Sequence, residues 1–309
     1  MTNVLTVKNL GKSFKSKQII QNITFDVRKG EIMAILGPNG AGKSTTIRHL
    51  MGFSKPDAGE TKIFDTETFN KYYEILNRVG YIPGEIALPA GLTGWEFIRM
   101  IQDLQHCHNE ERLNYLLKLF DLSPEGETKK MSLGVKRKLA IVTAFMADPD
   151  VLILDEPTSG LDPVMQEVFI QFIKDEKERG KTILLSSHIF SEVDATCDRI
   201  AIIKDGRIVS EFVANDLKHA STKYYNIKFD SNTSLEKFCK ECEDCDYITL
   251  IDKNVDESSC FISTDDKDIN KVIAILSKYE IRQFTNKKET LEDYFMKFYK
   301  EDKTFEGVS

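Results

Sequence analysis

One eight-residue segment constrains this chain more than any other feature: Gly37-Pro38-Asn39-Gly40-Ala41-Gly42-Lys43-Ser44. It matches the pattern G-x-x-x-x-G-K-[ST], in which small residues let consecutive backbone N–H groups point at a phosphate. The stretch 31–36 before it predicts a strand, and 43–51 after it predicts a helix whose positive end faces the same spot. A bare surface turn is the alternative, but the position between strand and helix favours a phosphate loop. Lys43 would supply charge for the outer phosphates and Ser44 a hydroxyl ligand for Mg²⁺.

Residues 1 to about 214 alternate between predicted strands and helices. Thr24–Val27 alternates apolar and polar residues, as a half-buried strand does, whereas Val151–Leu154 is apolar throughout, as expected when both faces of a sheet are covered. Further strands are predicted at residues 80–82, 182–186 and 200–203, and helices at 93–122 and from Ser132 to about 148. This order predicts an open α/β sheet, which binds ligands at the C-terminal ends of its strands.

Two adjacent carboxylates follow the predicted strand 151–154. Such pairs often only cap a helix or face water, but the phosphate loop upstream favours a catalytic pair. Asp155 would hold Mg²⁺, and Glu156 would orient and deprotonate a water for attack on a γ-phosphate. His188 follows the next strand and could bond the γ-phosphate or hold the water. The alternative is a packed or exposed histidine without a role, which is the interpretation of His49, His106, His108 and His219.

A second anion site is predicted where the helix after Ser132 begins. A serine at a helix start, followed closely by Gly134, presents N–H groups and the positive end of the helix dipole. The simpler interpretation is a helix cap and nothing more. One phosphate loop already serves a subunit, so this second site becomes useful when another molecule presents it across an interface.

The ordered set of these segments resembles the nucleotide-binding subunit of an ATP-binding cassette (ABC) transporter. In that family Gly37–Thr45 corresponds to the Walker A segment, Val151–Glu156 to Walker B, and His188 to the switch histidine. The segment 159–162 corresponds to the D-loop, 131–135 to the signature Leu-Ser-Gly-Gly-Gln, and Phe14 to an aromatic ring that stacks on adenine. The resemblance covers residues 1 to about 215. It implies a P-loop NTPase fold, α/β in class, with a helical subdomain at about residues 85–145.

The resemblance also implies function. Two copies, or one copy and a related subunit, would close around two ATP molecules, and hydrolysis would reopen the dimer. A separate membrane-spanning permease would turn this motion into transport, and export is the predicted direction because 155–163 and the tail resemble bacterial drug and antibiotic exporters. The implied roles are catalytic for Lys43, Glu156 and His188, metal-binding for Ser44 and Asp155, and ATP-binding for Phe14, Gly37, Pro38, Asn39, Gly40, Ala41, Gly42, Lys43, Ser44, Thr45, Ser132 and Gly134.

Two departures from the family pattern affect this site. The family places a glutamine, which senses magnesium and the attacking water, after Gly-Tyr-Ile-Pro, whereas here Gly84 stands at that position and Glu85 follows. Either Glu85 or a water substitutes for the glutamine, or the coupling of ATP to the membrane partner is altered. In the signature, Leu133 replaces the first glycine and Val135 the glutamine, while the serine and the second glycine are kept. An anion site is therefore still predicted there.

Residues 215–309 are predicted to form a small α+β accessory or regulatory domain. Strands at 224–229, 247–251, 260–263 and 281–284 and helices at 235–242, 268–277 and 291–299 give the βαββαβ order of a split-βαβ domain with an added helix. Cys239, Cys242, Cys245 and Cys260 have two interpretations. They are ligands of zinc or an iron–sulfur cluster, or they are small core residues on the helical face that also carries Leu235 and Phe238, which is the favoured interpretation.

Trp95 likewise has two interpretations. As the only tryptophan, beside Phe97, it is predicted to lie in the core of the helical subdomain. The sharper alternative is that the region around it, just after Gly84, forms the groove in which members of the family receive the coupling helix of their membrane partner.

Composition excludes other function classes. The 309 residues have a net charge of −7, with an excess of acidic side chains in 215–309, unlike the basic footprint of a nucleic-acid binder. Residues 1–10 lack the pattern of a signal peptide, and no apolar stretch approaches the roughly 20 residues that span a bilayer. The six cysteines suit a reducing cytosol. We therefore expect a cytoplasmic protein held at the membrane by a permease; the alternative is a soluble ABC-type switch on nucleic acid or ribosomes. The cargo is not encoded here.

Overall fold

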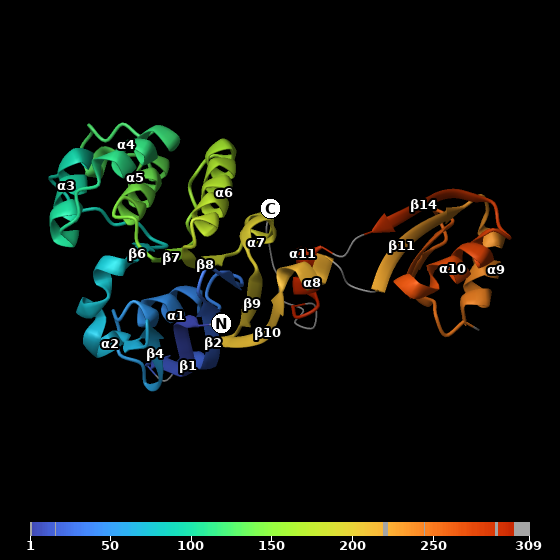
Figure 1. Ribbon diagram of the computed structural model, residues 1–309. Helices are drawn as coiled ribbons and strands as arrows, with labels where there is room; N and C mark the ends of the chain where they lie inside the picture. The colour runs from blue at the N-terminus through green and yellow to red at the C-terminus, as the bar shows by residue number, and fades with distance from the viewer. Residues whose placement is uncertain (1, 16, 219–221, 244, 288–289, 300–309) are drawn as a thin grey trace. The chain divides into compact units, whose positions relative to one another are not determined.

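The computed structural model describes residues 2–15, 17–218, 222–243, 245–287 and 290–299 (Figure 1). The chain divides into two compact units, residues 1–214 and 215–309. Within the described ranges, every helix is too short or too polar to cross a bilayer.

The larger unit is built around a sheet of order β10-β9-β3-β8-β7-β6. Neighbours from β9 to β6 run parallel, and β10 pairs antiparallel with β9 at one edge. Strands β3, β7 and β8 are buried along their whole length, because both faces of the sheet are covered. The strands are β3 (Ile32–Leu36), β6 (Val79–Ile82), β7 (Val151–Asp155), β8 (Thr182–Ser187), β9 (Arg199–Lys204) and β10 (Arg207–Val213).

An antiparallel sheet of order β2-β1-β4-β5 forms a second layer of the larger unit. Strand β1 shifts register between Val7 and Leu10, where Asn9 has a φ of 49°. This bulge interrupts the alternation of apolar residues, so the sequence pattern did not predict the strand. The strands are β1 (Asn3–Phe14), β2 (Lys17–Arg28), β4 (Ala58–Ile63) and β5 (Thr66–Glu67).

The core of the larger unit joins the two sheets through α1 (Lys43–Leu50). Ile47 and Leu50 of this helix pack in one apolar cluster with Val7 of the antiparallel sheet and Ile153 of the parallel sheet. The phosphate loop is therefore anchored at both ends, by a buried strand and by a buried helix.

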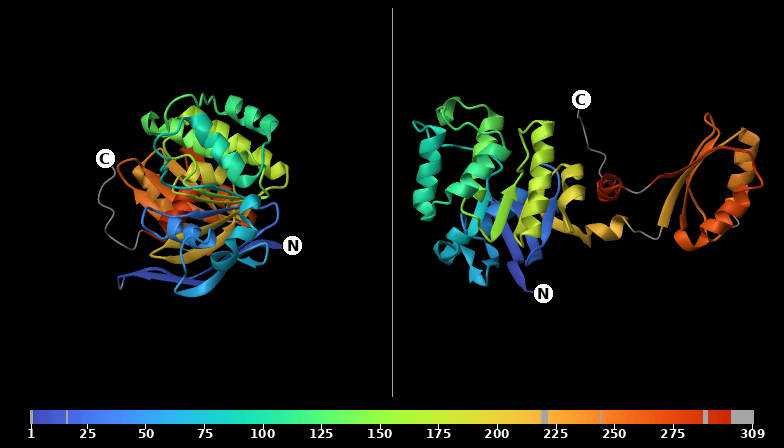
Figure 2. Two further views of the ribbon diagram at one scale, coloured as in Figure 1. Left: turned by 90° about the vertical axis from the view of Figure 1, so that its left-hand side faces the viewer. Right: turned by 45° about the horizontal axis from the view of Figure 1, so that its top comes forward.

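Helices α3 (Gly94–Gln105), α4 (Glu110–Leu119) and α5 (Leu133–Phe145) lie together on the side away from the antiparallel sheet (Figure 1, Figure 2). A capping box of Thr93 and Glu96 begins α3, and His106, at a φ of 49°, ends it. The predicted helical region 93–122 is therefore two helices. The remaining helices of this unit are α2 (Thr68–Lys71), α6 (Pro163–Glu178) and α7 (Phe190–Thr196), with short 3₁₀ turns at Tyr72–Glu74, Leu76–Arg78 and Thr128–Lys130; α8 (Ala214–Lys218) spans the boundary between the units.

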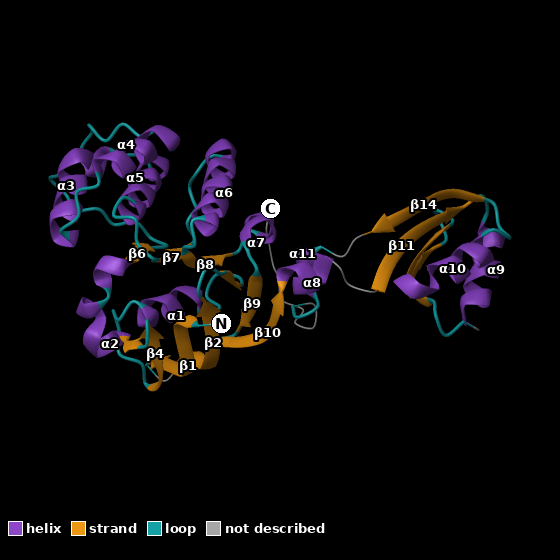
Figure 3. Cartoon of the chain, in the orientation of Figure 1, coloured by secondary structure: helices purple, strands orange, loops and turns teal. Residues whose placement is uncertain are grey.

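The smaller unit follows the predicted βαββαβ order, with α11 added at the end. Its antiparallel sheet has the order β12-β13-β11-β14, and α9 and α10 cover one face (Figure 3). Leu235, Phe238 and Val272 of the helices pack against Ile227 and Ile262 of the sheet. The elements are β11 (Thr222–Phe229), α9 (Asn232–Glu243), β12 (Thr249–Asn254), β13 (Ser259–Asp265), the 3₁₀ turn Asp266–Asp268, α10 (Ile269–Leu276), β14 (Ile281–Lys287) and α11 (Leu291–Met296).

Candidate functional site

The loop between β3 and α1 has the conformation of a phosphate cradle. A side chain at Gly37 would place its Cβ 2.6 Å from the carbonyl oxygen of Ile203, and Gly42 has a φ of 110°. Both positions therefore need glycine. Lys43 is 4% exposed and donates from Nζ to the carbonyl of Gly37 at 2.7 Å. The loop curls around this ammonium group and holds its positive charge at the start of α1.

Two carboxylates stand at the end of β7. Asp155 is buried and accepts a hydrogen bond from Ser186 Oγ at 2.5 Å. Glu156 leaves the strand conformation with a φ of 50°, which costs about 1–3 kcal/mol in a non-glycine residue and is typical of functional sites. Its Oε1 lies 3.0 Å from Lys43 Nζ, and its Oε2 lies 2.6 Å from His188 Nδ1. Glu156 therefore bridges the phosphate-loop lysine and the histidine.

A cavity of about 910 Å³ opens above these groups at the C-terminal ends of β3, β6 and β7. It collects most of the predicted site, including both carboxylates, the histidine and the helix start. A triphosphate is an anion, and the loop N–H groups, Lys43 and the N-terminus of α1 would complement its charge. The lining residues are Lys17, Ile19, Pro38, Asn39, Gly40, Gly42, Lys43, Ser44, Thr45, Arg48, Phe53, Tyr81, Pro83, Gly84, Glu85, Ala87, Asp155, Glu156, Ser159 and His188.

Some predicted nucleotide contacts do not line this cavity. Gly37 and Ala41 are buried in the loop itself. Phe14 is 54% exposed at the end of β1, and Lys12 Nζ lies 5.6 Å from its ring centre. Its hairpin neighbours Lys17 and Ile19 do line the cavity, so the adenine contact of Phe14 stays a prediction.

The segment of the second predicted anion site lies on the surface, apart from the cavity. Ser132 caps α5 and accepts a hydrogen bond from the N–H of Val135 at 3.3 Å. Leu133 is 56% exposed and lies against Gly160, where an added Cβ would come 2.8 Å from Leu133 Cγ. The cap is therefore present, and Ser132 and Gly134 are accessible enough to meet a second molecule.

Gly84 brings its backbone directly against the magnesium-binding candidate. A Cβ at this position would lie 2.9 Å from Asp155 Oδ2, closer than side-chain packing permits. Glu85 lines the same cavity. Its substitution for the family glutamine stays a prediction, and the close approach of Gly84 to Asp155 explains why a larger residue does not fit here unless the loop moves.

Two buried ionisable residues beside the site were not predicted from the sequence. Glu192, in α7, accepts a hydrogen bond from Ser187 Oγ at 2.6 Å, and burial, reinforced by the charge of Glu156, raises its pKa from 4.5 to about 7. Arg137, in α5, is 1% exposed and donates hydrogen bonds to the backbone carbonyls of Ser159, three residues after Glu156, and of Pro83. The sequence did contain hints of both: Glu192 follows His188 by four residues, and Arg137 lies within a mostly apolar predicted helix. Both positions also fit the solvated face of a helix, so neither was singled out.

The cysteines of the smaller unit belong to its core. Cys239, Cys242 and Cys260 are buried with Leu235 and Phe238 in one apolar cluster, as the favoured interpretation predicted. Burial raises the pKa of Cys242 to about 12, which keeps the thiol protonated at neutral pH. No cluster of three or more metal-ligating side chains is found in the described ranges.

Trp95 packs in the helical segment. It stands in the first turn of α3, half-buried, and its backbone N–H donates to the carbonyl of Pro124 at 2.9 Å. It does not line the apolar groove described below, whereas the neighbouring Phe97 does. The region after Gly84 contributes Ile86, Ala87 and Phe97 to that groove, so the alternative stays a prediction for this region, although Trp95 itself is not among the lining residues.

The strand–loop–helix around Lys43 and the carboxylates at the end of β7 define a P-loop ATPase cassette. The sequence profile of the family described as "ABC transporter" matches residues 20–159, and a profile described as "AAA domain, putative AbiEii toxin, Type IV TA system" matches 127–194. An uncharacterized ABC transporter ATP-binding protein of Bacillus subtilis, YcbN, is 31% identical over 96% of this chain and 97% of its own length. The chain therefore belongs to the ATP-binding subunits of ABC transporters, which are ATPases.

Named relatives and solved structures agree with this family. The bacitracin transport ATP-binding protein BcrA of Bacillus licheniformis is 33% identical over 96% of this chain and 97% of its own. A structure described as an ATP binding subunit of an ABC transporter superposes with a TM-score of 0.65 at 32% identity, covering 70% of this chain and 92% of that one. A dimeric, post-hydrolysis cassette, MJ0796 bound to ADP and Pi, has a TM-score of 0.62 at 25% identity, covering 68% and 98%.

Proposed function

We propose that this chain hydrolyses ATP between two copies of itself and thereby drives export by a separate membrane-spanning permease. The observation that carries the proposal is Glu156, held between Lys43 and His188 at the edge of a cavity sized for a nucleotide. ATP would replace Glu156 as the partner of Lys43, since the γ-phosphate carries more negative charge. The freed carboxylate could then orient a water, with His188 beside it.

The residues at the cavity fit a magnesium ion. Mg²⁺ prefers oxygen ligands, and Ser44 and Asp155 bring a hydroxyl and a carboxylate to the same cavity. Ser186 donates to Asp155 Oδ1, which leaves Oδ2 facing Gly84 at the cavity wall. When bound, the ion would neutralise charge that develops on the phosphates. We therefore assign Ser44 and Asp155 as its ligands.

We further propose that each ATP is shared between two subunits. Ser132 and Gly134 lie outside the cavity on the surface, so they can contact a triphosphate only when a second molecule presents them. The MJ0796 cassette, which has this fold, is dimeric with ADP and Pi. Bound ATP would close the dimer, and loss of the γ-phosphate would reopen it.

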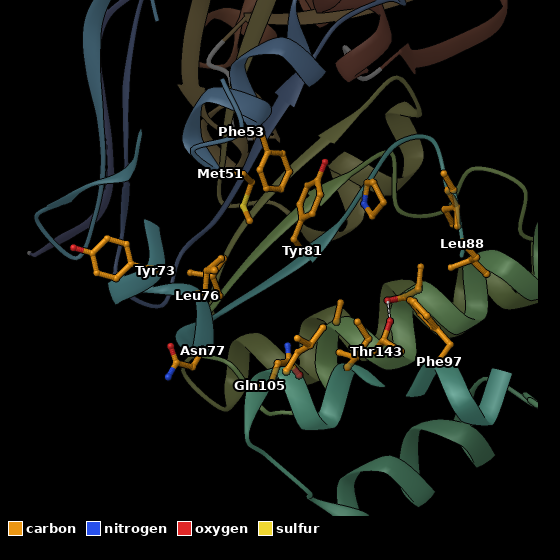
Figure 4. A pocket seen from close by; sticks show the side chains of 18 of the residues that line it. Met51, Phe53, Tyr73, Leu76, Asn77, Tyr81, Leu88, Phe97, Gln105 and Thr143 are labelled. Carbon is orange, nitrogen blue, oxygen red and sulfur yellow. Dashed lines mark hydrogen bonds between the residues drawn. The ribbon is translucent and has the colours of Figure 1, made fainter. Parts of the chain in front are cut away.

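An apolar groove of about 550 Å³ supplies a docking site for the permease. Figure 4 shows Phe53 and Tyr81 on one side and Phe97 on the opposite side. Its rim exposes Leu104 by 70% and Phe53 by 55%, and its lining is mostly apolar. An amphipathic helix from the cytoplasmic side of a permease suits such a groove. Tyr81 and Ala87 also line the ATP cavity, so movement at one site would reach the other.

Export rather than import is proposed from two relatives. BcrA is named for bacitracin transport, and a relative from Burkholderia lata, 34% identical over 66% of this chain and 69% of its own, is named a Nod factor export ATP-binding protein. This chain would lie at the cytoplasmic face of the membrane, bound to its permease. The C-terminal unit is proposed to be accessory to this function.

Inverted membrane vesicles test the direction and the need for ATP. Vesicles carrying this chain and the permease that co-purifies with it should take up labelled bacitracin with ATP, and vesicles with Glu156→Gln should not. Uptake into right-side-out vesicles only would contradict export. Recovery of the chain with nucleic acid or ribosomes, and not with membranes, would instead favour the soluble switch.

The groove has its own test. Leu104→Asp should abolish co-purification with the permease, whereas Val164→Asp should not, because Val164 is 65% exposed in α6 outside the groove. Equal recovery of both variants would exclude the groove as the docking site.

A further inference from the structure

A single buried guanidinium ties together three segments that surround the catalytic carboxylates. Arg137 lies in the second turn of α5, five residues after Ser132. Its Nε donates to the carbonyl of Ser159 at 2.9 Å, and its two terminal nitrogens donate to the carbonyls of Pro83 at 2.9 Å and Gly84 at 2.7 Å. These three bonds use the planar fork of arginine, which no other side chain provides.

Each of the bonded segments flanks a functional group. Pro83 and Gly84 follow β6, and Gly84 lies against Asp155. Ser159 follows Glu156 by three residues, and its N–H bonds the carbonyl of Glu156 at 3.1 Å. Movement of Arg137 would therefore shift the backbone beside each of the two carboxylates.

The cost of burying this charge indicates that its position matters. Arg137 is 1% exposed, and the three acceptors are neutral main-chain carbonyls. Burial lowers its pKa, and the negative charges of Asp155 and Glu156 offset part of that effect. A buried cation without a directly bonded carboxylate contributes little to stability for the desolvation it requires. Its location is better explained by a role beside the two carboxylates.

The glycine at position 84 makes the bond from Arg137 more important. In the family pattern a glutamine side chain stands there, and in this chain a glycine leaves only backbone. Arg137 bonds the carbonyl of Gly84 itself, from the helix that begins after Ser132. The link between that helix and the metal-binding edge is thus made by the arginine.

We propose that Arg137 is a positioning residue that couples the helix carrying Ser132 to the two loops flanking Asp155 and Glu156. When a shared nucleotide draws Ser132 toward it, α5 moves, and the guanidinium carries that movement to Gly84 and Ser159. The inference rests on the proposed function, because it needs Ser132 to respond to ATP held by another subunit.

Arg137→Met tests this role, because methionine keeps apolar packing and removes all three hydrogen bonds. Arg137 touches no residue of the phosphate loop in these contacts, so ATP affinity should change by less than about threefold. The kcat should fall by about 10- to 100-fold, since small misplacements of catalytic groups have effects of this size. Arg137→Lys keeps the charge without the fork, and its kcat should stay at least about tenfold below wild type for the same reason.

Arg199→Met is the matched control. Arg199 is also buried, at 6% exposed, in the same unit, but it pairs with Glu31 and Glu211 away from the cavity. This variant should have a lower Tm than wild type, yet its kcat at saturating ATP should stay within about threefold of the wild-type value. If both methionine variants lose kcat in proportion to their lowered Tm, Arg137 has only a structural role.

Further outcomes separate the inference from the function on which it rests. A kcat of Arg137→Lys within about threefold of wild type would overturn the inference, and so would such a kcat for Arg137→Met. Should Arg137→Met not fold, the lysine variant decides alone. In the Glu156→Gln background, Arg137→Met should also reduce the fraction of ATP-dependent dimer. If the parent Glu156→Gln protein forms no dimer with ATP, the proposed shared site fails, whatever the arginine does.

Discussion

Glu192→Gln should remove a pH dependence that wild-type stability carries. Glu192 is 2% exposed, and burial raises its pKa from 4.5 to about 7, with the charge of Glu156 as a further cause. The folded state therefore holds a proton here that the unfolded state releases. The stabilisation by the protonated form is complete below pH 4.5 and is lost as the pH rises toward 7.

The magnitude follows from these two pKa values. Linkage between them gives a loss of about 2 to 3 kcal/mol in the free energy of unfolding from pH 5 to pH 8. Glutamine has the same shape, can still accept the bond from Ser187, and does not titrate. The free energy of unfolding of Glu192→Gln, minus that of wild type, should therefore rise by that amount from pH 5 to pH 8.

Urea unfolding followed by the fluorescence of Trp95, the only tryptophan, measures this difference at pH 5, 6, 7 and 8. Comparing the two proteins at each pH cancels the titration of the other carboxylates. A difference that stays constant within about 0.5 kcal/mol, the usual range for independent effects, would refute the argument from burial.

Further substitutions test other parts of the site. Lys43→Ala should weaken ATP binding at least about tenfold, as loss of a charge-assisted contact does, while Lys62→Ala on the surface should not; unchanged turnover of Lys43→Ala would contradict the phosphate loop. Gly84→Ala should raise the Mg²⁺ concentration for half-maximal ATPase activity by about tenfold, or 1.4 kcal/mol, because its Cβ would lie 2.9 Å from Asp155 Oδ2. The control is Gly126→Ala, whose Cβ meets no atom within 4 Å. Equal Mg²⁺ requirements in the two variants would refute the steric argument. Glu85→Ala should lower ATPase activity and its stimulation by the permease, and if both are untouched, Glu85 does not replace the glutamine.

Local patterns predicted the elements that hold the phosphate. The phosphate loop is formed by residues that are neighbours in the sequence, so its glycines and Lys43 could be recognised from a short motif. The apolar run 151–154 indicates a strand buried on both faces, so sequence alone placed Asp155 and Glu156 at a strand end. The same reasoning found the βαββαβ order of the smaller unit, because each element is short and bounded by polar turns.

Long-range contacts were beyond that reasoning. Arg137 bonds carbonyls 53 and 54 positions away, and backbone acceptors leave no trace in residue identity. Tertiary packing buries Glu192 and raises its pKa, whereas its sequence position fits a solvated helix face. The break at His106 depends on a left-handed conformation that is uncommon outside glycine and that the sequence pattern did not signal. The bulge at Asn9 likewise hid β1.

Cross-linking between two copies tests the shared nucleotide most directly. Ser132 and Asn39 are both exposed, so Ser132→Cys in one copy and Asn39→Cys in another can be joined after the native cysteines are replaced. In the Glu156→Gln background, a cross-link should form with Mg-ATP and be absent with ADP. The account fails if Mg-ATP yields no cross-link between copies that demonstrably bind it.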